Sequence, residues 1–286
     1  MDLCNINHIK ALLARHKFHF SKSLGQNFLI DPQIPQDIAA AAGLGATVGV
    51  LEIGPGIGCL TVELAKLANK VATVEFDKNL YPILGETLKD YDNISLIRGD
   101  ILEADLDALV NEHFSGLKPV VAANLPYHIT TPILSKLIDS KLFAQITVMV
   151  QREVALRMCA APGTSDYGAF SLYINYHTKA EILFDIPPGS FVPAPKVFSS
   201  VICLTKRDVP PVNTQPEKLF ALIKAAFSQR RKTLVNCIMS TSPHIPKDQL
   251  VAGLKSLGLD PRIRGEVLSL EQFSALADLL IAQGFF

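Results

Sequence analysis

The stretch Val48-Gly-Val-Leu-Glu-Ile-Gly-Pro-Gly-Ile-Gly58 joins an apolar, strand-like run to a turn that contains three glycines. Glycines at a strand-to-helix turn let the backbone approach a ligand closely, where a Cβ would clash. A helical pattern of apolar residues starts near Cys59, directly after the turn. The stretch therefore predicts the first strand, turn and helix of a nucleotide-binding βαβ unit, with Gly54 and Gly56 as candidate cofactor-binding residues.

The segments around this stretch repeat the same alternation. Short, β-branched and largely apolar runs lie at 71–75, 94–98, 120–123 and 146–150. Such strands are typically buried on both faces, as in a parallel sheet. Helical apolar spacing lies between them, at 60–67, 80–88 and 131–142. The alternation predicts an α/β fold with a doubly wound, Rossmann-like sheet.

The second half of the chain changes character. Residues 160–205 contain strand-like stretches at 172–176, 182–184 and 200–204, which we interpret as a continuation of the sheet with a hairpin. A proline-rich linker follows Leu204, and helical patterns then cover 218–227, 232–239, 248–257 and 270–283. Ser269 and Gln272 form a potential capping box for the last helix. We expect a domain at 1–207, including an N-terminal basic arm, and a small helical domain at 208–286.

Composition excludes several classes of protein. Of the 286 residues, 49% are hydrophobic and 19% charged, so the chain can form a substantial core. No apolar run approaches the roughly 18 residues of a membrane span, and the polar N-terminus argues against a secretory signal. Five scattered cysteines without a CxxC pair argue against a disulfide framework or a metal site. These features predict a cytoplasmic protein.

The zero net charge hides an uneven distribution along the chain. Lys and Arg outnumber Asp and Glu by 4 to 1 in residues 1–27 and by 18 to 12 in residues 118–286. Residues 52–117 are acidic instead, with 5 basic and 12 acidic side chains. This uneven charge distribution is compatible with a nucleic-acid partner, although the net charge is zero.

Acidic residues at two predicted strand ends indicate what the glycine turn binds. Glu75 ends the second strand 21 residues after Gly54, with Asp77 two positions further on. A carboxylate there can accept hydrogen bonds from both ribose hydroxyls of an adenosine-containing cofactor. Asp100, at the tip of the third strand, is placed to read the adenine amino group. NAD-binding turns have the spacing GxGxxG, whereas here the third glycine comes one residue early, as in the (D/E)xGxG motif of methyltransferases.

The fourth strand ends at Asn124-Leu125-Pro126-Tyr127, where the proline keeps the loop extended and rigid. The Asn124 amide oxygen and the Leu125 carbonyl provide two acceptors near one point, and Tyr127 adds a flat π-face. This set suits an exocyclic amine on a planar heterocycle and needs no general base. In isolation, the same residues could also form a turn with a core tyrosine.

These residues resemble the (N/D)PPY-like motif of amino-methylating methyltransferases, and the NLPY form is similar to that of the ribosomal RNA adenine dimethyltransferases. Further stretches resemble this family in order along the chain, from residue 20 to about 270: the segment ending in Gly25-Gln-Asn-Phe-Leu29, Gln151-Arg-Glu-Val-Ala155, Tyr167-Gly168, Phe191-Val-Pro-Ala-Pro-Lys-Val197 and Phe227-Ser-Gln-Arg-Arg-Lys-Thr-Leu234. Ala194 and His128 depart from the residues that are common in the family.

The resemblance implies a class I methyltransferase sheet that uses S-adenosylmethionine. Asn27 and Leu29 would line its methionine side, and Gly54 would approach it closely. Glu75 would take the ribose, Asp100 would read the adenine end, and Asn124 would sit between cofactor and target. Tyr127 and Phe191 would sandwich a flipped adenine.

The resemblance also implies the reaction. It is the dimethylation of the N6 amines of two adjacent adenosines near the 3′ end of small-subunit (16S) rRNA during 30S ribosome biogenesis, by a monomeric enzyme. One alternative is a large-subunit rRNA adenine N6-methyltransferase of the macrolide-resistance type, against which Leu125 and residues 230–232 argue. Others are a mainly non-catalytic ribosome-assembly factor, disfavoured by the intact motifs, and a small-molecule dehydrogenase, disfavoured by the glycine spacing.

Two basic clusters are candidate RNA contacts. Arg15, Lys17 and Lys22 alternate with aromatic residues, a pattern suited to phosphates and unstacked bases. Arg230, Arg231 and Lys232 stand at a predicted helix start, where the helix dipole disfavours cations, so a phosphate partner would explain them. The alternative for either cluster is a solvated surface.

Overall fold

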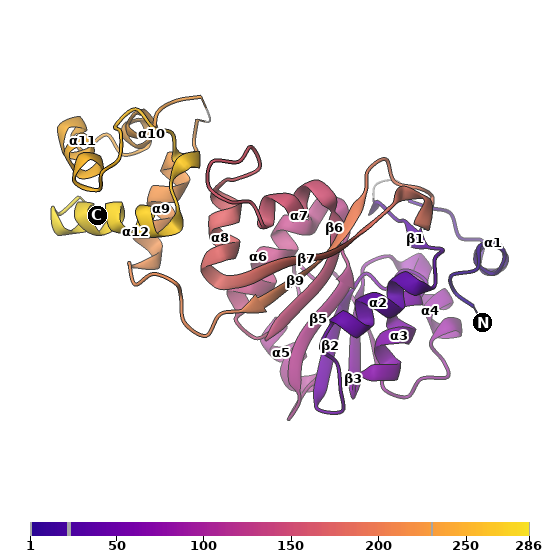
Figure 1. The fold of residues 1–286 in the computed structure, drawn as a ribbon. Coiled ribbons are helices and arrows are strands. Elements are labelled where there is room, and N and C mark those ends of the chain that lie inside the picture. Colours follow the sequence, from indigo (N-terminus) through magenta and orange to yellow (C-terminus); the bar gives the residue numbers. More distant parts are fainter. Residues whose placement is uncertain (1, 22–23, 230, 286) are drawn as a thin grey trace. The chain divides into compact units, whose positions relative to one another are not determined.

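The computed structural model describes residues 2–21, 24–229 and 231–285. Lys22 and Arg230, both predicted RNA contacts, lie outside the described residues. The chain forms two compact units, one built from residues 1–155 and 181–206 and the other from 156–180 and 207–286. Figure 1 shows the elements of both units along the chain.

A seven-stranded sheet forms the centre of the first unit, in the order β4-β3-β2-β5-β6-β9-β7. The strands are β2 (Val48–Ile53), β3 (Lys70–Glu75), β4 (Ile94–Arg98), β5 (Lys118–Asn124), β6 (Gln145–Gln151), β7 (Thr178–Ile186) and β9 (Ser199–Lys206). Neighbouring strands from β4 to β6 are parallel, and β9 pairs with β6 antiparallel. The predicted α/β sheet is confirmed, and the carboxyl ends of its parallel strands meet at one edge.

Helices bury the apolar faces of these strands. They are α2 (Gln33–Ala41), α3 (Cys59–Leu67), α4 (Tyr81–Thr87), α5 (Leu106–His113) and α6 (Thr130–Ser140). Ile38 of α2 and Leu64 of α3 pack with Val50 in one cluster. On the opposite face, the ring of Phe114 after α5 lies so close to Gly49 that a Cβ there would be 2.3 Å away. Strand β4 at the sheet edge is only half-buried, a correction to the expectation of burial on both faces.

The described part of the N-terminal segment, predicted as a basic arm, is tied to the first unit by a helix, a short strand and a buried ring. It contains α1 (Ile6–Arg15) and the two-residue strand β1 (Phe28–Leu29), which pairs with β8 (Phe191–Val192). Phe18 is buried in a cluster with Leu84 of α4 and Phe28, and its ring also contacts Phe20. Tertiary contacts therefore hold this segment, and Phe18 is a core residue.

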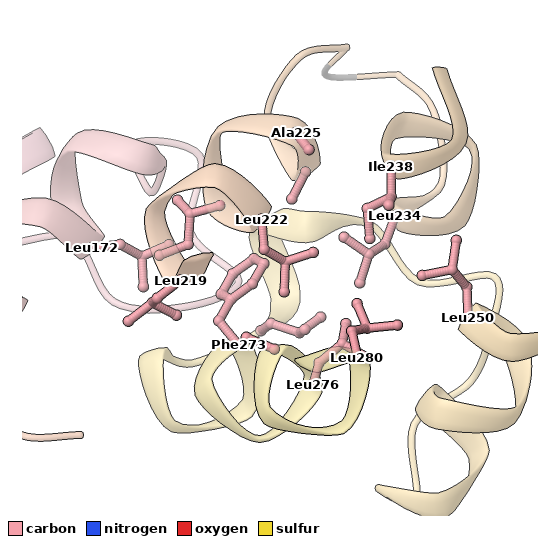
Figure 2. Packing of buried hydrophobic residues seen from close by; sticks show 14 of the residues in the cluster. Leu172, Leu219, Leu222, Ala225, Leu234, Ile238, Leu250, Phe273, Leu276 and Leu280 are labelled. Carbon is pink, nitrogen blue, oxygen red and sulfur yellow. The ribbon is translucent and has the colours of Figure 1, made fainter. Parts of the chain in front are cut away.

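The second unit has a helical core, seen from close by in Figure 2. Its helices are α8 (Ala169–His177), α9 (Pro216–Ala226), α10 (Leu234–Thr241), α11 (Lys247–Ser256) and α12 (Leu270–Ala282), and α7 (Arg152–Met158) begins in the first unit. Leu172 of α8, Leu222 of α9 and Phe273 of α12 are fully buried together in this core. The predicted capping box at Ser269 is present, with Gln272 N–H donating to Ser269 Oγ at 3.3 Å.

Residues 172–176, predicted as a strand, are helical and belong to α8. Leu172 and Tyr176 are four residues apart and so share one helix face, which packs into the helical core. Gly168 caps the helix start, where its N–H donates to Ser171 Oγ at 3.1 Å. The two units divide between residues 206 and 207, and residues 156–180 group with the helical unit.

Candidate functional site

A cavity of about 310 Å³ opens at the carboxyl ends of the parallel strands. It lies where β3 and β5 flank β2, at the point where the strand order reverses; ligands of open α/β sheets bind at such points. The lining includes all residues predicted to bind the cofactor: Asn27, Leu29, Gly54, Gly56, Glu75, Asp100 and Asn124. Leu125 and Tyr127 line it as well. Segments separated by up to a hundred residues therefore meet at one site.

The glycine turn forms the floor of the cavity after β2. Gly54 and Gly56 have positive φ angles of 69° and 60°, which other residues rarely adopt. A Cβ on Gly56 would lie 3.2 Å from the Phe28 ring. The turn therefore needs glycine both for its backbone conformation and for its packing against β1.

Two buried carboxyl groups lie beside this turn. Glu75 at the end of β3 is 6% exposed, and burial raises its pKa to about 7. Its Oε1 accepts a hydrogen bond from the Asp77 N–H at 2.7 Å. Burial also raises the pKa of Glu52 to about 7, although Thr61 Oγ1 donates to its Oε2 at 2.7 Å. A ligand with hydroxyl donors would stabilise the ionised form of Glu75.

The segment before β1 is tied to the same strand end. Gln26 Nε2 donates to Asp77 Oδ2 at 2.6 Å, and the Gln26 Oε1 accepts from the Ser21 N–H at 2.9 Å. Asn27 Nδ2 donates to the Gly25 carbonyl at 2.8 Å, and Asn27 is half-buried at the cavity. Gln26, which lines the cavity, thus joins the N-terminal segment to the loop after β3.

The loop after β4 forms another side. Asp100 Oδ1 accepts from the Leu102 N–H at 2.8 Å, which shapes the loop. Lys136 of α6 donates from Nζ to the Leu102 and Ala104 carbonyls at 2.7 and 2.6 Å. The ammonium group therefore holds the Asp100 loop against α6.

The segment after β5 brings the polar groups of the predicted reaction to the cavity. Asn124 is half-buried, and within the described residues its side-chain amide has no hydrogen-bond partner. Leu125 is buried, and its N–H donates to the Met149 carbonyl at 3.1 Å. Tyr127 lines the cavity, and its hydroxyl lies 2.6 Å from Ser199 Oγ. The Asn124 amide is therefore available to a ligand.

Phe191, predicted to stack on the target adenine opposite Tyr127, is not among the residues that line this cavity. It is 3% exposed and packs in the apolar cluster of Ile34, Ile38 and Leu29. It is the register partner of Leu29, which does line the cavity. Directly paired residues of neighbouring strands point to the same face, and both side chains lie in one buried cluster, at whose edge Leu29 borders the cavity.

The basic residues separate into two groups. Arg15 forms an ion pair with Glu86, and Lys17 is exposed directly after α1. In the second unit, Arg231 and Lys232 are exposed and precede Thr233, whose hydroxyl caps α10. These two cations therefore lie before the helix, which begins at Leu234, two residues after the predicted start at Lys232. Lys232 also lines a second, polar cavity of about 240 Å³.

Several residues of the cavity and its supports were not predicted. Phe76 is 58% exposed at the cavity, and its signal was an aromatic residue placed between two acids. Gln26 lies inside the quoted GQNFL segment but was given no role. Ser199 and Lys136 carry no local signal, because their hydrogen-bond partners are distant in the chain. Across the described ranges, no helix has the length and apolarity of a membrane span, and no cluster of side chains suits a metal ion.

The chain is similar to known proteins over most of its length. The family model described as ribosomal RNA adenine dimethylase matches residues 17–280. A protein of Geobacillus thermodenitrificans named ribosomal RNA small subunit methyltransferase A is 45% identical over 285 residues, which are 98% of this chain and 97% of that protein. A protein of the same name from Alkaliphilus metalliredigens is 44% identical over 276 residues, 96% of both chains.

Two solved structures share the fold over most of the chain. A dimethyladenosine transferase from Plasmodium falciparum has a TM-score of 0.75 and 27% identity, covering 90% of this chain and 99% of that one. The 23S rRNA methyltransferase ErmE has a TM-score of 0.68 and 25% identity, covering 89% and 99%.

Proposed function

Because the chain belongs to the ribosomal RNA adenine dimethylase family, we propose that it dimethylates the N6 amines of two adjacent adenosines near the 3′ end of small-subunit rRNA, using S-adenosylmethionine. The observation that carries the proposal is the meeting of the glycine turn, Glu75 and the Asn124–Tyr127 segment in one cavity. The small-subunit names of the relatives at 44–46% identity support the choice of rRNA.

The cavity fits the proposed cofactor. Its volume of about 310 Å³ is within the range of pockets that hold small ligands. Glu75 offers a buried acceptor for ribose hydroxyls, and the glycine turn leaves backbone space beside it. Asp100 and the exposed ring of Phe76 lie at the strand ends where an adenine would be placed. When bound, S-adenosylmethionine supplies an activated methyl group on a sulfonium centre.

The residues of the chain would orient the target amine. The Asn124 amide oxygen accepts one hydrogen bond from the N6 amine, and the Leu125 carbonyl is the second acceptor. Tyr127 provides a face on which the flipped adenine stacks, replacing part of the stacking lost when it leaves the RNA helix. Holding the amine by two acceptors favours a geometry with an exposed lone pair, so that positioning and electrostatics accelerate the reaction. In this mechanism no side chain acts as a general base.

The proposal also defines partners and location. The substrate is the small ribosomal subunit, bound in part through Lys17 and the basic segment at 230–232, and the enzyme acts as a monomer. Such a substrate places the enzyme in the cytoplasm, where ribosomal subunits are assembled.

Label transfer tests this function. S-adenosylmethionine with a labelled methyl group is incubated with the protein and unmethylated small or large subunits, and the nucleosides are analysed. We expect N6,N6-dimethyladenosine in small subunits only. Label in large subunits would favour the macrolide-resistance type of reaction, and no label in either would favour a non-catalytic assembly factor.

The role of Asn124 is tested in the same system. Asn124→Ala should slow single-turnover methylation at saturating enzyme and cofactor much more than it weakens subunit binding. Asn111→Ala, at an exposed position on α5, is the control and should react normally. An Asn124→Ala enzyme with the wild-type rate would remove the amide from the mechanism.

A further inference from the structure

The hydroxyl of Tyr127 is held by a residue of β9, which is two strands from β5 in the sheet. Its Oη lies 2.6 Å from Oγ of Ser199, which is 72 positions away in the chain and fully buried in β9. We propose that Ser199 is a positioning residue, which fixes the Tyr127 ring as the wall against which the target base stacks. This inference rests on the proposed function and adds a residue to which no role has been assigned.

Ser199 is itself held rigidly. It pairs with Gln151 in the β6–β9 ladder, and the preceding carbonyl of Phe198 accepts from the Arg152 N–H at 3.0 Å. On its other side, Ser200 Oγ donates to Asp185 Oδ1 at 2.5 Å. Hydrogen bonds therefore fix the backbone on both sides of Ser199.

A salt bridge between Arg152 and Asp185 adds to the contacts that hold Ser199 in place. Arg152 Nε donates to Asp185 Oδ2 at 2.8 Å, so one carboxylate joins the start of α7, β7 and β9. Both Arg152 and Asp185 are about half exposed, so the pair alone contributes little stability. Its geometric effect is to keep β9 in place beside Tyr127.

The backbone of Tyr127 is also anchored, at the opposite end of the side chain. Tyr127 begins the short helix η3 (Tyr127–Ile129), where Thr130 Oγ1 donates to the Pro126 carbonyl at 3.1 Å. Without the bond to Ser199, the ring could still rotate about its side-chain torsions. Fixing both ends of the side chain removes that freedom, and rates of transfer depend steeply on such placement.

The character of the phenol agrees with a tethering role. Burial raises the pKa of Tyr127, so its hydroxyl stays protonated under ordinary conditions. With its hydroxyl paired to Ser199, the ring contributes its face to the cavity and takes no part in proton transfer.

Three variants separate positioning from stability. Ser199→Ala leaves the phenol without its partner, Tyr127→Phe leaves the serine without its partner, and the double variant removes both polar groups. An unpaired buried hydroxyl is costly, whereas removing both partners is nearly neutral. We expect both single variants to lower the melting temperature and the double variant to recover most of it.

Single-turnover methylation of unmethylated small subunits gives the deciding readout. The methylation rate of each single variant and of the double variant should fall by about 10-fold. The effects should not add, because all three variants lack the same hydrogen bond between Tyr127 and Ser199. Ser199→Thr should restore most of the rate, since it keeps the hydroxyl. Cofactor affinity measured by calorimetry should stay within about two-fold of wild type. Thr147→Val, which removes another buried hydroxyl of the sheet, should lower stability while keeping the rate.

The outcomes are distinct. A wild-type rate in Ser199→Ala, with an active wild-type enzyme, overturns this inference alone. Recovery of rate together with stability in the double variant also overturns it, because Ser199 would then act only through folding. An inactive wild-type protein overturns the proposed function, and this inference with it.

Discussion

Burial sets the chemical character of the charged residues at the cavity. Glu75 has an ordinary sequence position at a strand end, but its buried carboxyl has a pKa of about 7. The nearby charge of Asp77 adds to this effect of burial on the pKa of Glu75. Glu52 is buried as well, and the charge of Glu75 raises its pKa further. At neutral pH, Glu75 is therefore close to the midpoint of its titration.

This midpoint predicts a pH dependence of cofactor affinity. Ribose hydroxyls donate hydrogen bonds, and an ionised carboxylate accepts them better than a protonated one. Affinity for S-adenosylmethionine should therefore rise as the pH increases from about 6 to 8, as Glu75 loses its proton. Calorimetry across this range measures the rise.

Glu75→Gln should weaken binding by about 1–3 kcal/mol at pH 8 and abolish the rise. The control is Glu52→Gln, which keeps a partner for Thr61 and should retain the rise. A Glu75→Gln protein that keeps the full pH dependence would assign the titration to another group.

At the scale of elements, two short strands determine one side of the site. β1 and β8 pair through only two residues each, with Phe28 opposite Val192 and Leu29 opposite Phe191. This register places Leu29 and Phe191 on the same face, where both are buried in one cluster and Leu29 also borders the cavity. The contribution of Phe191 is thus to packing.

Phe191→Ala should consequently destabilise the fold. Removing a buried phenylalanine typically costs about 3–5 kcal/mol, through lost burial and the cavity left behind. Urea unfolding followed by circular dichroism measures the change. Phe198→Ala, a 49% exposed phenylalanine nearby in the chain, should cost far less. If Phe191→Ala kept wild-type stability but lost affinity for the target base, the stacking role predicted from the sequence would be restored.

At the scale of the whole molecule, the helical unit includes residues 156–180, a segment from the middle of the chain. Tyr167, Leu172 and Tyr176 of residues 156–180 are buried against α9 and α12. A chain that ended at the linker would expose these side chains.

The truncated chain 1–207 should therefore bind the dye ANS and be cleaved rapidly by protease within residues 156–180. The glycine turn and strands 48–151 of the same sample serve as the internal control and should resist longer. Protection of 156–180 equal to that in the full chain would show that this segment folds without the C-terminal helices.

The basic segment of the helical unit should contribute to subunit binding by charge alone. Neutralising Arg230, Arg231 and Lys232 together should reduce the salt dependence of binding by about 2–3 units of slope, if each contacts one phosphate. Filter binding over a range of salt concentrations measures it. Neutralising Lys66, which already pairs with Glu63, should leave the slope unchanged. An unaltered slope in the triple variant would leave the segment as a solvated surface.

The sequence by itself determined the α/β sheet and the strand ends at which the cavity lies. Alternating apolar runs specify strands and helices locally, and the carboxyl ends of parallel strands must meet at one edge. Residues at those ends, such as Gly54, Glu75 and Asn124, are therefore brought together by the topology alone. The capping box at Ser269 was equally local, since its partners are three residues apart.

Only the tertiary structure decided which side chains support that cavity. The direction of Phe191 depends on its pairing with β1, and the role of Ser199 depends on a tyrosine 72 residues away. The short apolar run at 172–176 suits a strand or a helix, and burial against α9 and α12 selected the helix. Local sequence patterns do not encode these choices, because each depends on contacts between segments that are distant in the chain.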